Sequence, residues 1–110
     1  MDHGWLSTLR KDGSPRLARV WFVEHNGAVW MASGHTTLKV ADILRDKRVG
    51  FAREGQHEAM RGVAAIVSID SEPEVQDLFK AGYEGWDVAD PAIDGTRVLI
   101  RAHPWSDPTR

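Results

Sequence analysis

Apolar and polar residues alternate along the first third of the chain, and two turn signals divide it. Asp12-Gly13 and Asn26-Gly27 each lie between runs rich in Leu, Val, Trp and Phe. Such dipeptides suit hairpin turns, because they accept the positive φ angles that these turns need. The pattern therefore predicts three strands of an antiparallel meander: Trp5–Arg10, Arg16–His25 and Ala28–Ser33.

The second of these strands carries apolar side chains on both of its faces. Arg19 shares one face with Leu17 and Trp21, and Arg16 shares the other face with Ala18 and Val20. Apolar groups on both faces indicate that both faces are covered. In a chain of this size, such a strand favours a closed barrel that packs against a partner subunit or a ligand.

The hydrophobic period then changes from two to that of a helix. Val40, Ala41 and Leu44 form a helical stripe within Thr36–Asp46. The rest of the pattern predicts the strands Arg48–Arg53, Arg61–Ile69 and Thr96–Ala102, and a second helix, Ser71–Gly82, with Ser71 as its N-cap. This order predicts an α+β barrel of six antiparallel strands and two short helices. We expect the barrel to form a single domain over residues 1–110, with residues 103–110 as a loose tail.

Composition excludes several classes of protein. With 14 basic and 16 acidic residues among 110, the formal charge of −2 gives no field for nucleic acid or an acidic membrane. The absence of cysteine excludes disulfides, thiolate metal sites and cysteine nucleophiles. The longest apolar stretch, Gly62–Val67, is far too short to span a membrane, and we expect a cytoplasmic protein. No hydrolase, P-loop or Rossmann motif is present.

The start of the first predicted helix suggests an anion site. It reads Ser33-Gly34-His35-Thr36-Thr37-Leu38-Lys39, without an acid before Asp42. A cation in the first turn is unfavourable by roughly 0.3–1 kcal/mol. The arrangement is explained if backbone N–H groups, hydroxyls and Lys39 form a cradle for a phosphate. A solvated lysine beside ordinary threonine capping explains it equally well, and this stretch alone favours neither.

Two arginines of the second strand favour the ligand hypothesis. A buried guanidinium needs a partner, and a phosphate or carboxylate accepts two of its N–H groups. An antiparallel third strand that ends at Ser33 brings the helix start close to Arg16 and Arg19. The alternative partners of these arginines are Glu24, Asp12 or another subunit.

Other chemistry-bearing side chains give weaker signals. Trp21 and Trp30 lie in facing strands and are able to stack on a planar ring, although core packing explains a tryptophan more often. The five histidines show no metal-ligand spacing, which predicts no metal site, and only His35 falls near the proposed site.

Several segments, taken in order, carry a family resemblance. They are Leu6-Ser7-Thr8-Leu9, Asp12-Gly13-Ser14-Pro15-Arg16, Val20-Trp21-Phe22-Val23, Trp30-Met31-Ala32-Ser33, and Lys39-Val40-Ala41-Asp42-Ile43-Leu44 with Lys47-Arg48-Val49. This series resembles the pyridoxamine 5′-phosphate oxidase-like split-barrel family. The match is good over residues 4–53, is looser over 61–73, and returns as a generic strand at Arg97–Arg101. It implies a six-stranded split β-barrel homodimer that holds a flavin, FMN, in grooves at the subunit interface.

The resemblance also implies a set of cofactor-binding residues. The second strand follows the flavin ring and its phosphate tail, the end of the third strand and the helix start bind the phosphate, and the partner subunit adds an arginine. The matching positions are Arg16, Arg19, Val20, Trp21, Phe22, Ala32, Ser33, Thr37, Lys39 and Arg61. No catalytic residue is implied.

Departures from the family pattern define the alternatives. Relatives with oxidase activity carry an arginine directly before the lysine, where this chain has Leu38, so vitamin B6 oxidation is not expected. We expect an FMN-binding, oxidoreductase-like homodimer that acts on a small molecule. One alternative is a deazaflavin-dependent reductase of the same family. The other is a non-enzymatic module that binds haem, a tetrapyrrole or no cofactor, which Leu38 and Trp21 favour.

Overall fold

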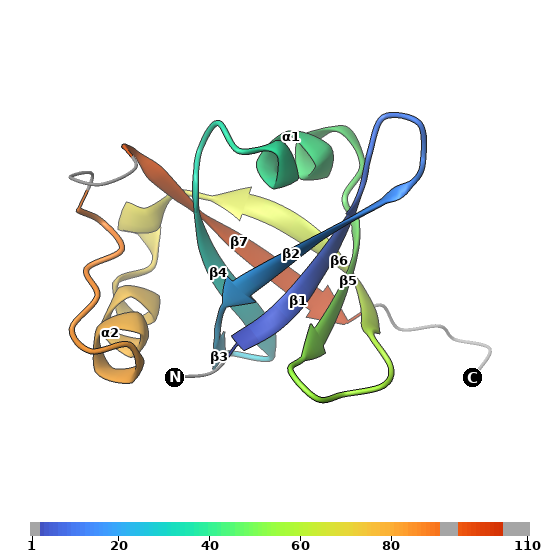
Figure 1. Ribbon diagram of the computed structural model, residues 1–110. Coiled ribbons are helices and arrows are strands. Elements are labelled where there is room, and N and C mark those ends of the chain that lie inside the picture. Colours follow the sequence, from blue (N-terminus) through green and yellow to red (C-terminus); the bar gives the residue numbers. More distant parts are fainter. Residues whose placement is uncertain (1–2, 91–94, 105–110) are drawn as a thin grey trace.

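Seven antiparallel strands form one curled sheet in the order β2-β1-β5-β6-β7-β4-β3 (Figure 1). The structure, a computed structural model, describes residues 3–90 and 95–104. The strands are β1 (His3–Leu9), β2 (Pro15–Trp21), β3 (Val23–His25), β4 (Ala28–Gly34), β5 (Arg48–Arg53), β6 (Met60–Val67) and β7 (Arg97–Pro104). The helices are α1 (Leu38–Arg45) and α2 (Pro73–Gly82), preceded by a 3₁₀ turn, η1 (Ile69–Ser71).

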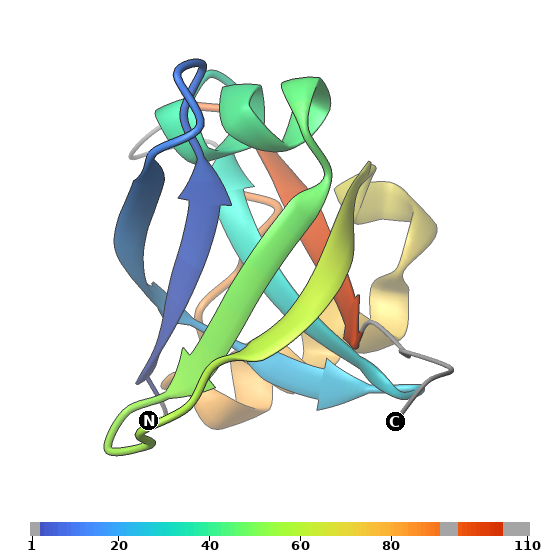
Figure 2. The same ribbon diagram turned by 90° about the vertical axis from the view of Figure 1, so that its right-hand side faces the viewer.

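The sheet curls so far that strands from opposite ends of its order come together. β2 and β4, which are five places apart in the sheet, contact each other. Helix α1 lies across one end of the curled sheet, and α2 lies on its outside (Figures 1 and 2). The predicted α+β split-barrel class is therefore confirmed, although its strands number seven and not six.

The fold has two apolar cores because side chains of β4 and β7 point alternately to the two faces of the sheet. Met31 and Ile100 belong to the core inside the curl. Trp30 and Leu99 belong to a second core, which packs against Val75 and other residues of α2. The second core fixes α2 on the outside of the sheet, beside the groove described below.

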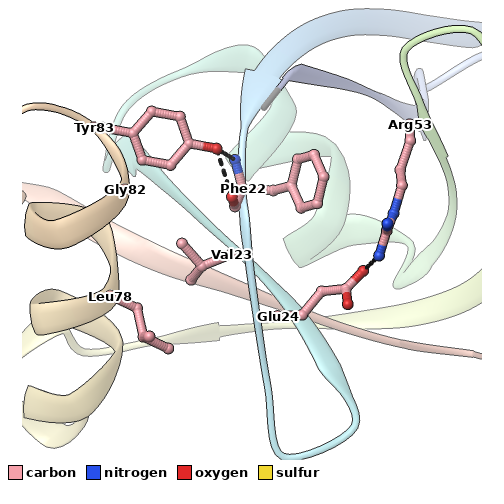
Figure 3. A pocket seen from close by; sticks show the side chains of 7 residues that line it. All are labelled: Phe22, Val23, Glu24, Arg53, Leu78, Gly82 and Tyr83. Atoms are coloured by element: carbon pink, nitrogen blue, oxygen red, sulfur yellow. Dashed lines mark hydrogen bonds and ion pairs between the residues drawn. The ribbon is translucent and has the colours of Figure 1, made fainter. Parts of the chain in front are cut away.

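The extra strand arises because the predicted strand Arg16–His25 is interrupted at Phe22. The backbone N–H of Phe22 donates to the hydroxyl of Tyr83 over 3.0 Å, and this hydroxyl donates to the carbonyl of Phe22 over 2.6 Å (Figure 3). Both backbone groups of Phe22 thus pair with one side chain. The prediction of a single strand is wrong at this residue. The local pattern gave no sign of the break, because Tyr83, which causes it, lies 61 positions further along the chain.

The apolar stripe predicted for the first helix is correct at Val40 and wrong at Ala41 and Leu44. Helix α1 buries Val40, Asp42 and Ile43, whereas the Leu44 side chain is 71% exposed. Asp42 faces inward because Arg16 and Thr8 of the sheet donate hydrogen bonds to its carboxylate. A buried ion pair therefore sets the rotation of this helix.

Most element ends differ from the sequence prediction by one or two residues, and some of these differences bear on the site. The first strand begins at His3 and not at Trp5, and Glu72, not Ser71, is the N-cap of α2. The last strand extends through Pro104, so residues 103–104 of the predicted tail belong to β7. The rest of that tail, 105–110, lies outside the described residues.

We expect Gly4→Ala to lower the free energy of unfolding by about 1–3 kcal/mol, because the new methyl group overpacks the core. A Cβ at Gly4 would lie 2.6 Å from the Phe51 ring and 3.0 Å from the carbonyl oxygen of Ala52. Urea denaturation measures the change. Gly50→Ala is the matched control, because a Cβ there would lie at ordinary contact distances, 3.6 Å from the Cβ atoms of Ala59 and Ser7 and 3.9 Å from the carbonyl oxygen of Met60. Equal stabilities of the two variants would contradict the prediction.

Candidate functional site

One groove gathers half of the residues that the sequence analysis assigned to a ligand. Its volume is about 320 Å³, and strands β1, β2 and β4, helix α1 and the loop after α2 contribute to it. The residues that line it are His3, Arg19, Val20, Trp21, Ala32, Lys39 and Trp86. Arg19, Val20, Trp21, Ala32 and Lys39 are thus brought together as predicted neighbours. We call this hollow the β2 groove.

Aromatic rings form one wall of the β2 groove. The Trp21 ring stacks on Tyr83 with centroids 5.0 Å apart and planes 20° apart. Trp86 meets the same indole edge-on at 5.0 Å. The Trp21 side chain stays 36% exposed. The groove therefore presents a partly exposed indole that its neighbours hold in place.

Trp30 does not share this wall, contrary to the hypothesis that it stacks with Trp21 on a ligand. It is buried in the core beneath α2, and its indole N–H donates to the carbonyl of His25 over 3.0 Å. The guanidinium of Arg101 lies 5.9 Å from its ring. Trp30 therefore has a packing role.

The cationic groups of the groove come from different elements. Arg19 of β2 donates from Nη2 to both carboxylate oxygens of Glu54, over 3.1 and 3.4 Å. Lys39 stands in the first turn of α1, which contains no acidic residue. The partner of Arg19 is thus neither Asp12 nor Glu24, and Lys39 adds a positive charge where the helix dipole is also positive.

Arg16 lies beneath α1, next to the buried carboxylate of Asp42. Its Nε donates to Asp42 Oδ2 over 2.6 Å, and Thr8 Oγ1 donates to the same oxygen over 2.7 Å. Arg45 donates to Oδ1 over 2.9 Å. Burial alone would raise the pKa of Asp42, but the bonds from Arg16, Thr8 and Arg45 outweigh it and lower the pKa to about 2. Within the described part of the chain, no hydrogen bond engages the terminal Nη groups of Arg16.

The two hydroxyls of the predicted cradle bond within the β4–α1 connection. Ser33 Oγ and Thr37 Oγ1 lie 2.7 Å apart, and each lies 3.1 Å from the carbonyl oxygen of Gly34. One hydroxyl therefore donates to the other, which donates to this carbonyl. Thr37 is the N-cap of α1, yet its side chain makes no capping bond. Ser33 and Thr37 therefore adjoin the groove residues Ala32 and Lys39 in sequence, with their hydroxyls turned to local partners.

Two of the predicted site residues line other hollows. Phe22 faces a hollow of about 310 Å³ between β3 and α2, which Arg53, Leu78 and Tyr83 also line (Figure 3). Arg61 lines a hollow of about 400 Å³ with Arg48 and neighbours on β5 and β6. Neither residue is brought to the β2 groove within this chain. For Arg61, the resemblance expects a role in the groove of a partner subunit.

The sequence analysis missed two residues that line the groove, His3 and Trp86. The alternation that places Trp5 on one face of β1 places His3 on the same face. Extending the predicted first strand by two residues toward the N-terminus would therefore have included His3. Trp86 lies in an aperiodic loop, which gave no signal. His35, expected near the site, is exposed, and its Nδ1 lies 3.0 Å from the carbonyl oxygen of Thr96.

Two further expectations concern metals and membranes. Residues 3–90 and 95–104 contain no group of three or more His, Asp or Glu side chains placed to hold a metal ion. No helix in this described part is long and apolar enough to cross a membrane.

Comparison with solved structures shows the same fold in proteins of low sequence identity. The haem storage protein HutZ from Vibrio cholerae has a TM-score of 0.76 at 17% identity, over 96% of this chain and 82% of that one. An F420 reductase has a TM-score of 0.71 at 22% identity, over 96% and 87%. An FAD-binding protein from Mesorhizobium loti has a TM-score of 0.70 at 14% identity, over 96% and 83%. A search of curated protein sequences found no match.

The curled sheet, the helix across its end and the groove along β2 define a protein of the split-barrel class. A family model described as pyridoxamine 5′-phosphate oxidase matches residues 2–105. The chain therefore belongs to the pyridoxamine 5′-phosphate oxidase family.

Proposed function

We propose that this protein binds FMN in the β2 groove and serves as a flavin-dependent oxidoreductase for a small molecule. The observation that carries the proposal is the presence of a cation, Lys39, and an aromatic wall, Trp21 and Trp86, in one groove. FMN combines a phosphate with a planar ring, so both halves of this arrangement have a counterpart in the ligand. A volume of about 320 Å³ falls at the lower end of the range of roughly 300–1,000 Å³ that is typical of ligand sites.

The phosphate end of the proposed site lies at the start of α1. Lys39 supplies charge, and the first turn of a helix has backbone N–H groups without an intrahelical partner, which suit an anion. The bond from Arg16 Nε to Asp42 leaves the Nη groups of this arginine for a second acceptor. Arg16 is not among the residues that line the β2 groove, and we propose that these remaining donors reach the phosphate from beneath α1.

The ring end lies at Trp21. Stacking between an indole and a flavin ring is favourable, and its geometry is restricted because Tyr83 and Trp86 already hold the indole. When bound, the flavin supplies hydride transfer, and the protein supplies orientation and electrostatics. The backbone N–H of Phe22 does not donate to the flavin ring in this proposal, because it already donates a hydrogen bond to the hydroxyl of Tyr83.

We further propose that the functional unit is a homodimer. The outer face of β2 carries Leu17, whose side chain is 65% exposed, and Trp5 of β1 is exposed beside it. Arg61 lies away from the groove of its own chain and is proposed to reach the phosphate of the partner's site. Analytical ultracentrifugation tests the dimer, and a mass equal to that of a single chain would contradict it.

We expect Lys39→Ala to weaken FMN binding about tenfold, because a charge-assisted phosphate contact is worth roughly 1.5 kcal/mol. Riboflavin, which has the same ring without the phosphate, should bind the wild type and the variant equally. Quenching of flavin fluorescence measures both affinities. Lys80→Ala, an exposed lysine of α2, is the control and should change neither.

Each other result points to a different conclusion. No binding of FMN at tens of micromolar contradicts the proposed function. Equal losses for FMN and riboflavin contradict the assignment of Lys39 to the phosphate. Stronger binding of the deazaflavin coenzyme F420 in a competing titration would favour a deazaflavin-dependent reductase. A haem absorption band that titrates to one site per chain would favour the non-enzymatic alternative.

A further inference from the structure

His3 and Trp21 make a hydrogen bond inside the β2 groove that fixes the protonation of the imidazole. Trp21 Nε1 lies 2.7 Å from His3 Nε2. The indole N–H only donates, so Nε2 must accept and carries no proton. The ring proton of neutral His3 therefore lies on Nδ1, which faces Glu54 Oε2 at 3.9 Å.

Protonation of His3 is incompatible with this bond. An imidazolium has N–H groups at both nitrogens, and its Nε2–H would then point at the indole N–H. The two side chains must separate, and both donors become available to another acceptor. When His3 is neutral, it and Trp21 satisfy each other's hydrogen bond. When His3 is protonated, the two side chains present two N–H donors and a positive charge.

The groups that face His3 determine the charge around it. Glu54, which follows β5, faces Nδ1, and Arg19 of β2 is paired with the same carboxylate. The guanidinium of Arg53 is turned to Glu24 and to the Phe22 ring. Among the described residues no second acidic group lies within ion-pair distance of His3. The Nδ1–H of an imidazolium would face Glu54, which Arg19 already pairs, and its Nε2–H would be left for a ligand in the groove, which Lys39 also lines.

We propose that His3 is a ligand-binding residue of the β2 groove, and that in its protonated form it donates from Nε2 to an oxygen or nitrogen acceptor at the edge of the planar ring that stacks on Trp21. This inference rests on the proposed function, because the ring is that of the flavin. Its consequence is that the groove binds a flavin ring more tightly at a pH at which the imidazole is charged than at a pH at which it is neutral.

Riboflavin is the appropriate probe, because it has no phosphate whose own ionisation would change with pH. We expect its affinity for the wild type, measured by fluorescence quenching, to rise about fivefold between pH 8.0 and pH 5.5, since a hydrogen bond from a charged donor is stronger than one from a neutral donor. His3→Gln keeps a neutral hydrogen-bonding side chain and should bind with a pH-independent affinity. His25→Gln is the matched control, since His25 pairs with Glu74 outside the groove and should keep the wild-type pH dependence.

A second measurement needs no ligand. The indole N–H resonance of Trp21, assigned by its loss in Trp21→Phe, should shift with pH in the wild type and stay constant in His3→Gln. Riboflavin binding without pH dependence in the wild type, or an unchanged dependence in His3→Gln, overturns this inference and leaves the proposed function intact. Absence of both riboflavin and FMN binding at every pH overturns the two together.

Discussion

Asp42→Asn should lower the free energy of unfolding by about 3 kcal/mol at pH 7, the largest effect expected of any variant discussed. Asp42 is only 2% exposed, and its carboxylate accepts hydrogen bonds from Arg16, Thr8 and Arg45. Asparagine keeps the shape but removes the charge, which leaves the guanidinium of Arg16 partly buried without its counter-charge. Breaking one half of such a pair costs about 3–5 kcal/mol, and the partial exposure of Arg16 favours the lower value.

Chemical denaturation of both proteins measures this loss, and Asp77→Asn is the matched control. Asp77 lies on the exposed side of α2, so the same change of side chain there should alter stability by less than about 0.5 kcal/mol. If Asp42→Asn were as stable as the control, the carboxylate would not hold α1 on the sheet. The variant should also weaken FMN more than riboflavin, because Arg16 loses the partner that orients it.

The same carboxylate makes stability depend on pH in a defined direction. The pKa of Asp42 is lowered from 3.8 to about 2 in the folded chain, so unfolding favours protonation. The stabilisation is therefore complete above about pH 4 and disappears as the pH falls through about 2. Its size is roughly 2 kcal/mol. In a series of urea titrations between pH 5 and pH 2, the wild type should lose about this much more stability than Asp42→Asn, because the lowered pKa of Asp46 affects both proteins alike.

Tyr83→Phe should lower the free energy of unfolding by about 2–3 kcal/mol. The hydroxyl of this buried residue both accepts from the N–H and donates to the carbonyl of Phe22. Without the hydroxyl, two buried backbone groups lose a partner, and each unsatisfied group costs about 1–3 kcal/mol. The ring itself stays, so the stacking on Trp21 at 5.0 Å should be kept.

The control for Tyr83→Phe is Ser71→Ala, which removes a hydroxyl from an exposed site. Ser71 Oγ donates to the carbonyl of Ser68 over 2.7 Å, and its loss should cost less than about 0.5 kcal/mol. Hydrogen exchange gives a local measurement, since the amide of Phe22 should exchange faster in Tyr83→Phe while those of β6 and β7 change only with global stability. Unchanged exchange at Phe22 would contradict the role assigned to the hydroxyl.

The interruption of the second strand shows why part of the fold was not predictable. The pattern from Arg16 to His25 is continuous, and nothing near Phe22 in the sequence indicates a break. Its cause is Tyr83, which approaches from the end of α2. The rotation of α1 has a similar origin, because the inward position of Asp42 depends on Arg16 of β2. Local periodicity contains no information on such distant partners.

The candidate site was predictable where residues follow one another along an element. Arg19, Val20 and Trp21 lie on one strand, and the turn at Asn26-Gly27 brings Ala32 alongside. Among the histidines, only His35 lies next to the predicted helix start in the sequence, so His3 was missed. Only the pairing of β1 with β2 places His3 opposite Trp21.

The sequence by itself determined the class of fold, the hairpins and the strand that carries the groove, because turn residues and the alternation of apolar side chains act over short distances. Tertiary structure decided the partners of the polar groups: Asp42 for Arg16, Glu54 for Arg19, Tyr83 for the backbone of Phe22, and His3 for Trp21. The physical reason is that a buried or half-buried polar group takes the nearest complementary group in space, and the pairing of the strands and the packing of the helices on the sheet decide which group that is.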